Sequence, residues 1–226
     1  MAWEHDIAPS ATSLTAKTAK PKIALCLPYT EALSPEFVEK VWGPLRWIPL
    51  EWCDKIPFMC KTQSLPMARN ILSQQALDAN CTHLLWVDSD SVIENPPDAN
   101  QALKMLYQCD AAISACLYRA KQKQGFNYAA WKKQGDGYTP IQSWTGNWFP
   151  VDVTGLHFCL IKREVFEKVS KPYFHWEEDT AVSEDFYFFE KAKQVGYDVW
   201  IFSEVRLSHL GALKVLSNGK VTTRDV

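Results

Sequence analysis

The stretch His83-Leu84-Leu85-Trp86-Val87-Asp88-Ser89-Asp90-Ser91 indicates the fold class of this chain more directly than any other. Its apolar half has the length of a strand buried on both faces, and the polar residues after it are typical of a loop at that strand's carboxyl end. Ligands of open α/β sheets bind at that edge. With an extended backbone, Asp88 and Asp90 share one face while Ser89 points away, so two carboxylates face one cation. The simpler alternative is an Asx turn, in which Asp90 or Ser91 caps the next segment.

Apolar runs and helical patterns alternate on both sides of this stretch. Further strands are expected at 22–27, 110–118, 157–161 and 198–202, with an edge strand at 47–52 that contains Pro49. Helices are expected from Ser34-Pro35 to a stop at Gly43-Pro44, from Pro66 onwards, and over 99–106, 163–168 and 186–195. Residues 53–65 are expected to form a loop. The alternation predicts an α/β fold with a mostly parallel central sheet flanked by helices.

Residues 119–150 interrupt that alternation. They contain several glycines and seven aromatic residues, and they show no clear periodicity. Such a segment inside a compact domain is usually a functional loop, a lid or a hairpin insertion. The faces of Trp144 and Trp148 could stack on a sugar ring, although any single aromatic side chain more often packs the insertion onto the sheet.

Composition places the chain among globular proteins and argues against some partners. It has 226 residues, of which 47% are hydrophobic and 22% charged, and its formal net charge is −2. That charge argues against general nucleic-acid binding. No apolar run reaches the roughly 18 residues that span a membrane. Seven dispersed cysteines without a C-x-x-C pair favour free thiols in a reducing compartment, so a cytoplasmic location is expected.

The chain is expected to form one domain. We predict a mobile tail at 1–20, a single domain over 21–212 with an acceptor-side insertion or lid at 119–150, and a polar C-terminal tail at 213–226.

A few polar residues stand out by position. Arg69 lies in the first turn of a helix, where the dipole disfavours a cation, which indicates a ligand or a carboxylate partner. Glu184 and Asp185 follow Ser183 at another helix start, where they are either catalytic or a cap with dipole-complementing acids. His83 and His157 lie within or beside apolar strands, so we expect structural roles for both.

Three segments then occur in a set order. Arg69-Asn70 precedes Asp88-Ser89-Asp90, Val153-Thr154-Gly155 precedes the strand at 157–161, and Ser183-Glu184-Asp185 opens a helix that is followed by Ser208-His209. This ordered set resembles glycosyltransferases of the GT-A (nucleotide-diphospho-sugar transferase) fold, close to the family 2-like group. The resemblance covers about residues 22–211.

The resemblance implies a role for each matching position. Contacts with the nucleotide-sugar are implied for Pro28, Tyr29, Thr30, Asp54, Arg69, Asp88 and Ser89. Metal ligation is implied for Asp88, Asp90 and His209. Asp185, beside Glu184, is implied as the general base of an inverting enzyme, and Trp144, Trp148 and Gly155 are expected on the acceptor or sugar side.

The chemistry is consistent with those roles. A departing nucleoside diphosphate needs a cation to stabilise its charge, and two carboxylates with an imidazole suit Mn²⁺ better than Mg²⁺. An acceptor hydroxyl must lose its proton as it attacks, and a carboxylate can take that proton. The implied acceptor carries its hydroxyl on a glycan, a lipid carrier, a protein or a modified nucleobase, and both inversion and retention remain open.

Two other functions compete with the transferase. A sugar-phosphate nucleotidyltransferase would carry a glycine-rich basic loop after the first strand, but residues 27–31 contain neither glycine nor lysine. A non-catalytic saccharide-binding module is suggested by the ten tryptophans and the aromatic insertion, and it would bind glycans without metal or nucleotide.

Overall fold

The computed structural model of this chain describes residues 20–94, 97–119, 127–176, 183–210, 213–215 and 221–223, without the side chains of 206, 209 and 213–223. The tail predicted at 1–20 lies outside the described residues except for Lys20.

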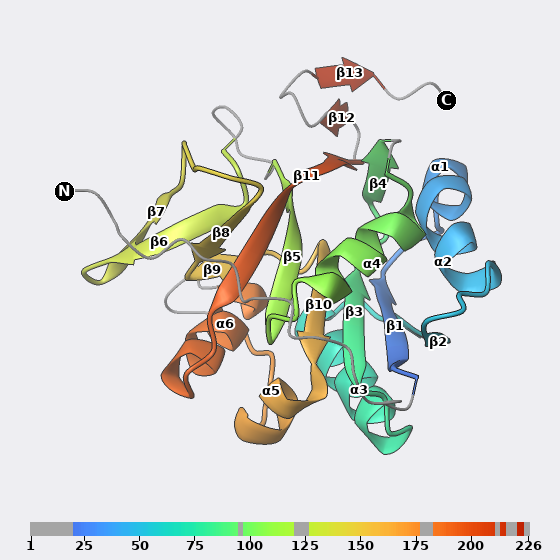
Figure 1. The fold of residues 1–226 in the computed structure, drawn as a ribbon, viewed down its shortest axis with the longest axis horizontal. Coiled ribbons are helices and arrows are strands. Elements are labelled where there is room, and N and C mark those ends of the chain that lie inside the picture. Colours follow the sequence, from blue (N-terminus) through green and yellow to red (C-terminus); the bar gives the residue numbers. More distant parts are fainter. Residues whose placement is uncertain are drawn as a thin grey trace.

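A mixed sheet crosses the molecule from side to side (Figure 1). Its ten strands are β1 (Lys22–Tyr29), β2 (Asp54–Lys61), β3 (His83–Val87), β4 (Ser91–Glu94), β5 (Ile113–Tyr118), β8 (Trp148–Val151), β10 (Phe158–Lys162), β11 (Val199–His209), β12 (Leu213–Val215) and β13 (Val221–Thr223). The main path runs β13-β12-β11-β5-β10-β3-β1-β2, and both β4 and β8 pair with β11. Because β12 and β13 continue the sheet, the domain boundary predicted at 212 falls inside the sheet.

The predicted α/β class is confirmed, but the mostly parallel arrangement is wrong, since only three of the nine described strand pairs of this sheet are parallel. β1 pairs in parallel with β2 and β3, and β11 with β5, whereas β10 runs antiparallel between β3 and β5. A parallel neighbour needs a crossover to the far edge of the sheet. The described end of the connection, His157, instead lies beside Asp88 at the carboxyl end of β3, and the chain enters β10 from that edge.

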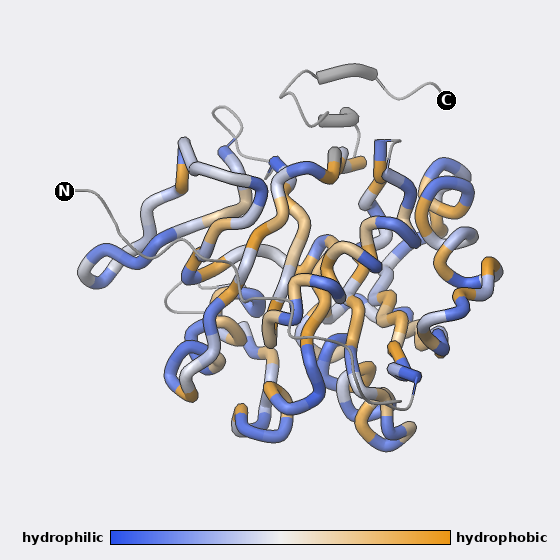
Figure 2. Tube along the Cα trace, viewed as in Figure 1, coloured by the Kyte–Doolittle hydropathy of each residue, from blue (hydrophilic) through white to orange (hydrophobic). Residues whose placement is uncertain are grey.

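Helices cover both faces of the sheet, and alternate strand residues feed the two resulting cores. The helical segments are α1 (Pro35–Phe37), η1 (Val38–Trp42), α2 (Gly43–Trp47), α3 (Leu65–Asp78), α4 (Ala99–Gln108), α5 (Arg163–Lys168) and α6 (Glu184–Gln194). In β3, Leu84 and Trp86 face the core under α3, α5 and α6, while Leu85 and Val87 face the core under α1, η1, α2 and α4. The apolar residues therefore concentrate in the interior strands (Figure 2). Burial on both faces explains why β3 is apolar at every position.

The first helical segment does not stop at Gly43-Pro44 as predicted. The Gly43 N–H donates to the carbonyl of Val38, five residues back, which makes one π-helical turn before α2 continues. A Cβ on Gly43 would lie 2.7 Å from that carbonyl oxygen, so only glycine fits this turn. Pro44 is tolerated because it occupies the first turn of α2, where no N–H is needed.

The second strand lies later in the chain than predicted. Residues 47–52 form no strand, and β2 occupies 54–61, which were expected to be a loop. β2 is the edge strand of the sheet, so it tolerates Pro57 and is only half buried. Its mixed apolar and polar sequence follows from that exposure.

Part of the predicted insertion, together with residues that follow it, forms a small second sheet that packs on α6. Its strands are β6 (Ala130–Gln134), β7 (Gly137–Pro140) and β9 (Val153–Thr154), in the order β7-β6-β9. Trp131 and Tyr138 contact the ring of Phe186 in α6 at 5.1 and 4.9 Å between centroids. The Tyr138 hydroxyl also donates to Glu190. These contacts fix the hairpin to α6.

The cysteine prediction is confirmed, since all seven are free thiols and six of them are buried. None of the helices described is long and apolar enough to cross a membrane.

Candidate functional site

The candidate site lies at the carboxyl edge of β1, β3 and β5. β3 ends at Val87, and Asp88, Ser89 and Asp90 form a tight turn into β4, closed by the Ser91 N–H bonding the Asp88 carbonyl at 3.0 Å. The two carboxylates therefore converge through a turn, and the extended backbone expected for them is wrong.

His157 lies beside the two carboxylates, which adds a candidate metal ligand to the structural role expected for this histidine. β10 pairs antiparallel with β3 so that Phe158 lies opposite Val87, and the Asp88 N–H then bonds the His157 carbonyl at 3.1 Å. In a parallel sheet, residue 157 would have lain at the far edge. The sequence does show a histidine directly before a strand. The direction of that strand, however, could not be predicted from the local sequence.

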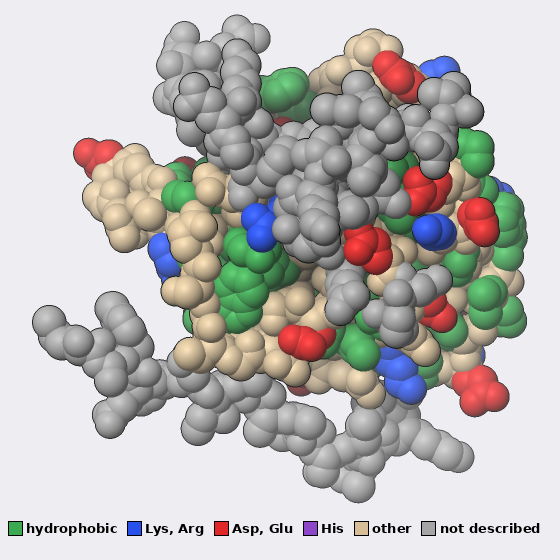
Figure 3. Space-filling model, turned by 90° about the horizontal axis from the view of Figure 1, so that it is seen from above, with side chains coloured by type: hydrophobic (Ala, Val, Ile, Leu, Met, Phe, Trp, Pro, Cys, Tyr) green, Lys and Arg blue, Asp and Glu red, His purple; other side chains and the backbone are tan. Residues whose placement is uncertain are grey.

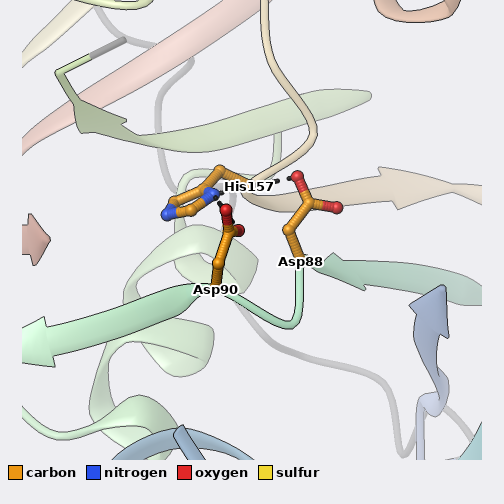
Figure 4. A group of neighbouring side chains, drawn as sticks. All are labelled: Asp88, Asp90 and His157. Atoms are coloured by element: carbon orange, nitrogen blue, oxygen red, sulfur yellow. Dashed lines mark ion pairs between the residues drawn. The ribbon is translucent and has the colours of Figure 1, made fainter. Parts of the chain in front are cut away.

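The side chains of Asp88, Asp90 and His157 form a group that fits one metal ion (Figure 4). The Nδ1 atom of His157 lies 3.7 Å from Asp88 Oδ2 and 3.6 Å from Asp90 Oδ1, and the three ligand atoms lie within 4.8 Å of one another. Adjacent ligand atoms on an octahedral ion at about 2.1 Å are about 3.0 Å apart, so these three atoms would move closer together around an ion and supply three of its six ligands. Two oxygens and one nitrogen suit Mn²⁺.

The surroundings of His157 favour Nδ1 as the ligand atom. Its buried ring places Nε2 3.4 Å from the Ser208 carbonyl oxygen, so Nε2–H donates there and the Nδ1 lone pair faces the carboxylates. The Ser91 hydroxyl donates to the His157 carbonyl at 2.8 Å and holds the backbone at this point.

Arg69 connects the candidate metal group to α6. Its guanidinium lies 3.1 Å from Asp88 Oδ1 through Nη2, 3.5 Å from Asp185 Oδ1 through the same nitrogen, and 3.3 Å from Glu184 Oε1 through Nε. Its side chain is 1% exposed, so the expected contact of Arg69 with the base or phosphates of a nucleotide is wrong. Burial lowers the pKa of Arg69, but the three carboxylates outweigh it and raise the pKa above its ordinary value. The other expectation for Arg69, a carboxylate partner, is confirmed, and the structure shows three such partners.

The acidic pair at the start of α6 is divided between two environments. Glu184 is buried against Arg69, which leaves it inaccessible and makes the predicted catalytic role of Glu184 wrong. The side chain of Asp185 is 18% exposed, and burial raises its pKa well above the ordinary value, although Arg69 opposes that rise. Asp185 is therefore the acid of the pair that a substrate can reach.

The other residues expected to contact the nucleotide lie at the ends of strands. Pro28, Tyr29 and Thr30 lie at the carboxyl end of β1, on the same edge as Asp88, and exposure increases from Pro28 to Thr30. Asp54 begins β2 opposite Lys22, the first residue of β1, so it lies at the opposite edge. Its predicted contact with the nucleotide is wrong because residues 54–61 form the strand itself.

Tyr118 and Gly155 also border the site. The Tyr118 ring stacks on the His157 ring at 4.4 Å between centroids. Burial raises the pKa of Tyr118 well above its ordinary value, and the carboxylates of Asp185, Asp88 and Asp90 add to that rise. The hydroxyl therefore keeps its proton at neutral pH. No role was expected for Tyr118 from the sequence.

The two tryptophans expected to stack on a sugar are engaged in packing. Trp144 stacks on Phe149 at 5.0 Å and contacts Tyr128 edge-on, and Trp148 stacks on Phe202 at 4.6 Å. Packing of the insertion onto the sheet is therefore the interpretation that the contacts favour for both.

His209 lies at the end of β11, where its backbone pairs with Ser91. Its side chain lies outside the described residues, so metal ligation by His209 stays a prediction. On the face drawn in Figure 3, the acidic and basic side chains that are described are interspersed, and Lys and Arg do not gather there in one patch.

Comparisons with known proteins bear on the fold. No protein-family model matches this chain, and no curated protein matches it. The similar solved structures include the crystal structure of A197 from STIV, with a TM-score of 0.62 and 18% sequence identity over 91% of this chain and 95% of that one. At this identity the similarity shows a shared fold and carries no statement about activity.

Proposed function

We propose that this chain is a metal-dependent glycosyltransferase of the GT-A fold, which transfers a sugar from a nucleoside-diphosphate sugar to an acceptor hydroxyl. The observation that carries the proposal is that one guanidinium nitrogen lies beside two acidic centres. Nη2 of Arg69 lies 3.1 Å from Asp88, which shares the candidate metal group with Asp90 and His157, and 3.5 Å from Asp185. Such a transferase needs a cation site and a base within reach of one sugar carbon.

On the donor side, Asp88, Asp90 and Nδ1 of His157 would hold the cation, and Mn²⁺ fits these ligands best. When bound, the cation would stabilise the negative charge that develops on the departing diphosphate. Tyr29 and Thr30, at the same edge of the sheet, would border the nucleoside.

On the acceptor side, Asp185 would take the proton of the attacking hydroxyl. A general base works best when its pKa is close to the working pH, and burial shifts the pKa of Asp185 upwards in that direction. Glu184 keeps Arg69 in place. We propose inversion, with direct attack by the deprotonated hydroxyl.

The first test measures thermal stability against a panel of nucleoside diphosphates, with and without Mn²⁺. A ligand that binds only the folded state stabilises it by about 2.7 kcal/mol at a hundredfold excess over its dissociation constant. We expect one nucleotide to raise the melting temperature only with Mn²⁺, and Asp90→Asn to abolish the shift. Asp136→Asn, in the exposed turn between β6 and β7, is the matched control and should keep it.

A second measurement tests the base. With the donor identified, Asp185→Asn should lose transfer while keeping the Mn²⁺-dependent nucleotide shift. Full transfer by that variant contradicts the assignment of Asp185. Absence of any nucleotide shift in the wild type contradicts the transferase, and glycan binding indifferent to metal would then favour a saccharide-binding module.

A further inference from the structure

The proposed function gives Tyr118 no role, although its ring stacks on His157 and its hydroxyl lies beside Gly155, which also neighbours Asp185. Tyr118 is the last residue of β5, separated from β3 by β10 in the sheet. Its position at the carboxyl edge brings its side chain between the candidate metal group and α6.

The ring of Tyr118 defines the plane of the His157 imidazole. The two rings are stacked, with an interplanar angle of 23° and 4.4 Å between centroids. With Nε2 directed at the Ser208 carbonyl, the stack leaves His157 little freedom to rotate, so Nδ1 stays directed at Asp88 and Asp90. Loss of a hydrogen-bonded partner that orients a metal ligand typically lowers metal affinity by about 10 to 100-fold, and we expect an effect of that order from loss of the stack.

The hydroxyl of Tyr118 occupies the space that a side chain at position 155 would fill. A Cβ on Gly155 would lie 1.9 Å from the Tyr118 hydroxyl oxygen, 3.1 Å from its Cζ and 3.4 Å from Asp185 Oδ2. Gly155 is not among the glycines with positive φ, so backbone conformation does not require glycine here. The requirement is space for the tyrosine hydroxyl beside Asp185.

We infer that Tyr118 is a positioning residue of the site: its ring orients His157 for metal binding, and the missing side chain of Gly155 allows its hydroxyl to reach the Asp185 carboxyl. The inference rests on the proposed metal site and extends it. The predicted place of Gly155 on the sugar side is replaced by a role in seating Tyr118. The Gly155 backbone and the Tyr118 phenol thereby connect the metal half of the site to the base half.

Metal binding by the full chain tests the inference, with Mn²⁺ alone as the probe and free Mn²⁺ measured by electron paramagnetic resonance. Gly155→Ala should push the tyrosine off His157 and weaken Mn²⁺ binding by about tenfold or more. Adding Tyr118→Phe to Gly155→Ala removes the atom at 1.9 Å and leaves the one at 3.1 Å, so most of the affinity should return. Such rescue by a second substitution is not expected from general destabilisation.

Two further variants complete the set. Tyr118→Leu removes the ring and should weaken Mn²⁺ binding as Gly155→Ala does. Gly137→Ala is the matched control, because its Cβ would meet only the Gln134 carbonyl at 4.0 Å, and it should bind Mn²⁺ as the wild type does. Wild-type affinity in Gly155→Ala, or no recovery in the double variant, overturns the inference.

A second readout separates this inference from the proposed function. Ring-current shifts of the His157 imidazole protons report the stack by nuclear magnetic resonance without any metal. We expect these shifts to collapse in Gly155→Ala and to return with the added Tyr118→Phe. If the wild type binds no Mn²⁺, the proposed metal site fails, while the ring-current result still decides whether Gly155 seats Tyr118.

Discussion

Arg69 is the residue on which the geometry of the site depends. It is buried, and its guanidinium faces Asp88, Glu184 and Asp185 at 3.1 to 3.5 Å. It also lies over the Trp86 ring, 5.5 Å from the centroid, so the planar group is held from one face as well as along its edge. Three acids can therefore gather in a small volume without the repulsion that unpaired carboxylates produce.

Removal of Arg69 should be costly. Arg69→Met leaves Glu184 buried without its cation, and breaking a buried pair costs about 3 to 5 kcal/mol of unfolding free energy. Urea unfolding measures the loss. Lys40→Met, which breaks the more exposed pair with Glu36 at 3.5 Å, is the control and should cost no more than about 0.5 kcal/mol. A loss below about 1 kcal/mol for Arg69→Met would show that the buried charges are not coupled as described.

At the scale of the elements, α3 and the segment before α6 act as one unit. Arg69 reaches α6 itself, while the next residue, Asn70, holds the backbone of residues 173–174. Its Nδ2 donates to the carbonyls of Pro66 and Phe174 at 2.8 and 2.7 Å, and its Oδ1 accepts from the N–H groups of Tyr173 and Phe174 at 3.0 and 3.2 Å. These contacts explain why Arg69 and Asn70 occur together in α3, because each residue holds a different part of the chain around Asp185.

Amide hydrogen exchange tests the role of Asn70. In Asn70→Ala the amides of Tyr173 and Phe174 lose their acceptor, and their protection should fall by about tenfold or more. In Asn70→Asp the acceptor oxygens remain, so these two amides should stay more protected than in the alanine variant. Gln74→Ala, one turn further along α3, is the control, because Gln74 bonds only the side chains of Asp78 and Lys171 among its described contacts. Equal exchange in both Asn70 variants would contradict this role.

At the scale of the whole molecule, stability depends on keeping polar groups neutral or paired at the edges of two apolar cores. His83, at the start of β3, is packed against Tyr107 and bonds the Thr82 hydroxyl at 2.9 Å. Burial lowers the pKa of His83 from 6.5 to about 4, with Lys162 adding to the effect. The structural role predicted for this histidine agrees with these contacts.

Acid should therefore destabilise the folded chain through His83. Between pH 6.5 and 4 the unfolded chain binds a proton that the folded chain does not, so the free energy of unfolding falls as the pH falls. The contribution is present in full above pH 6.5 and amounts to about 3 kcal/mol at most. His83→Gln should remove most of this fall between pH 7 and pH 4.5 in urea unfolding.

Measurement of both proteins at pH 8, where His83 is neutral in either state, gives the packing cost of the substitution separately. An unchanged acid dependence in His83→Gln would show that other groups account for it.

The sequence by itself determined the class of the fold and much of the position of its elements. The apolar run before Asp88, the proline-started α3 and the segments at 113–118 and 163–168 are local patterns, so they were readable without tertiary structure. The sequence also placed Asp88, Asp90 and Asp185 as candidates, because strand ends and helix starts are local features. It misplaced β2, since an edge strand that contains proline and alternates with polar residues resembles a loop.

Only the tertiary structure decided which residues meet. The antiparallel return of β10 brought His157 to Asp88 and Asp90, and the path of α3 under the sheet brought Arg69 to three acids at once. The direction of a strand depends on the edge of the sheet at which the preceding connection ends. For β10 that connection includes the insertion predicted at 119–150, and no local sequence pattern encodes where it ends. The proximity of Tyr118 and Gly155 has the same origin. Tyr118 ends β5 and Gly155 precedes β10, so the two residues are far apart in the sequence and meet only in the folded sheet.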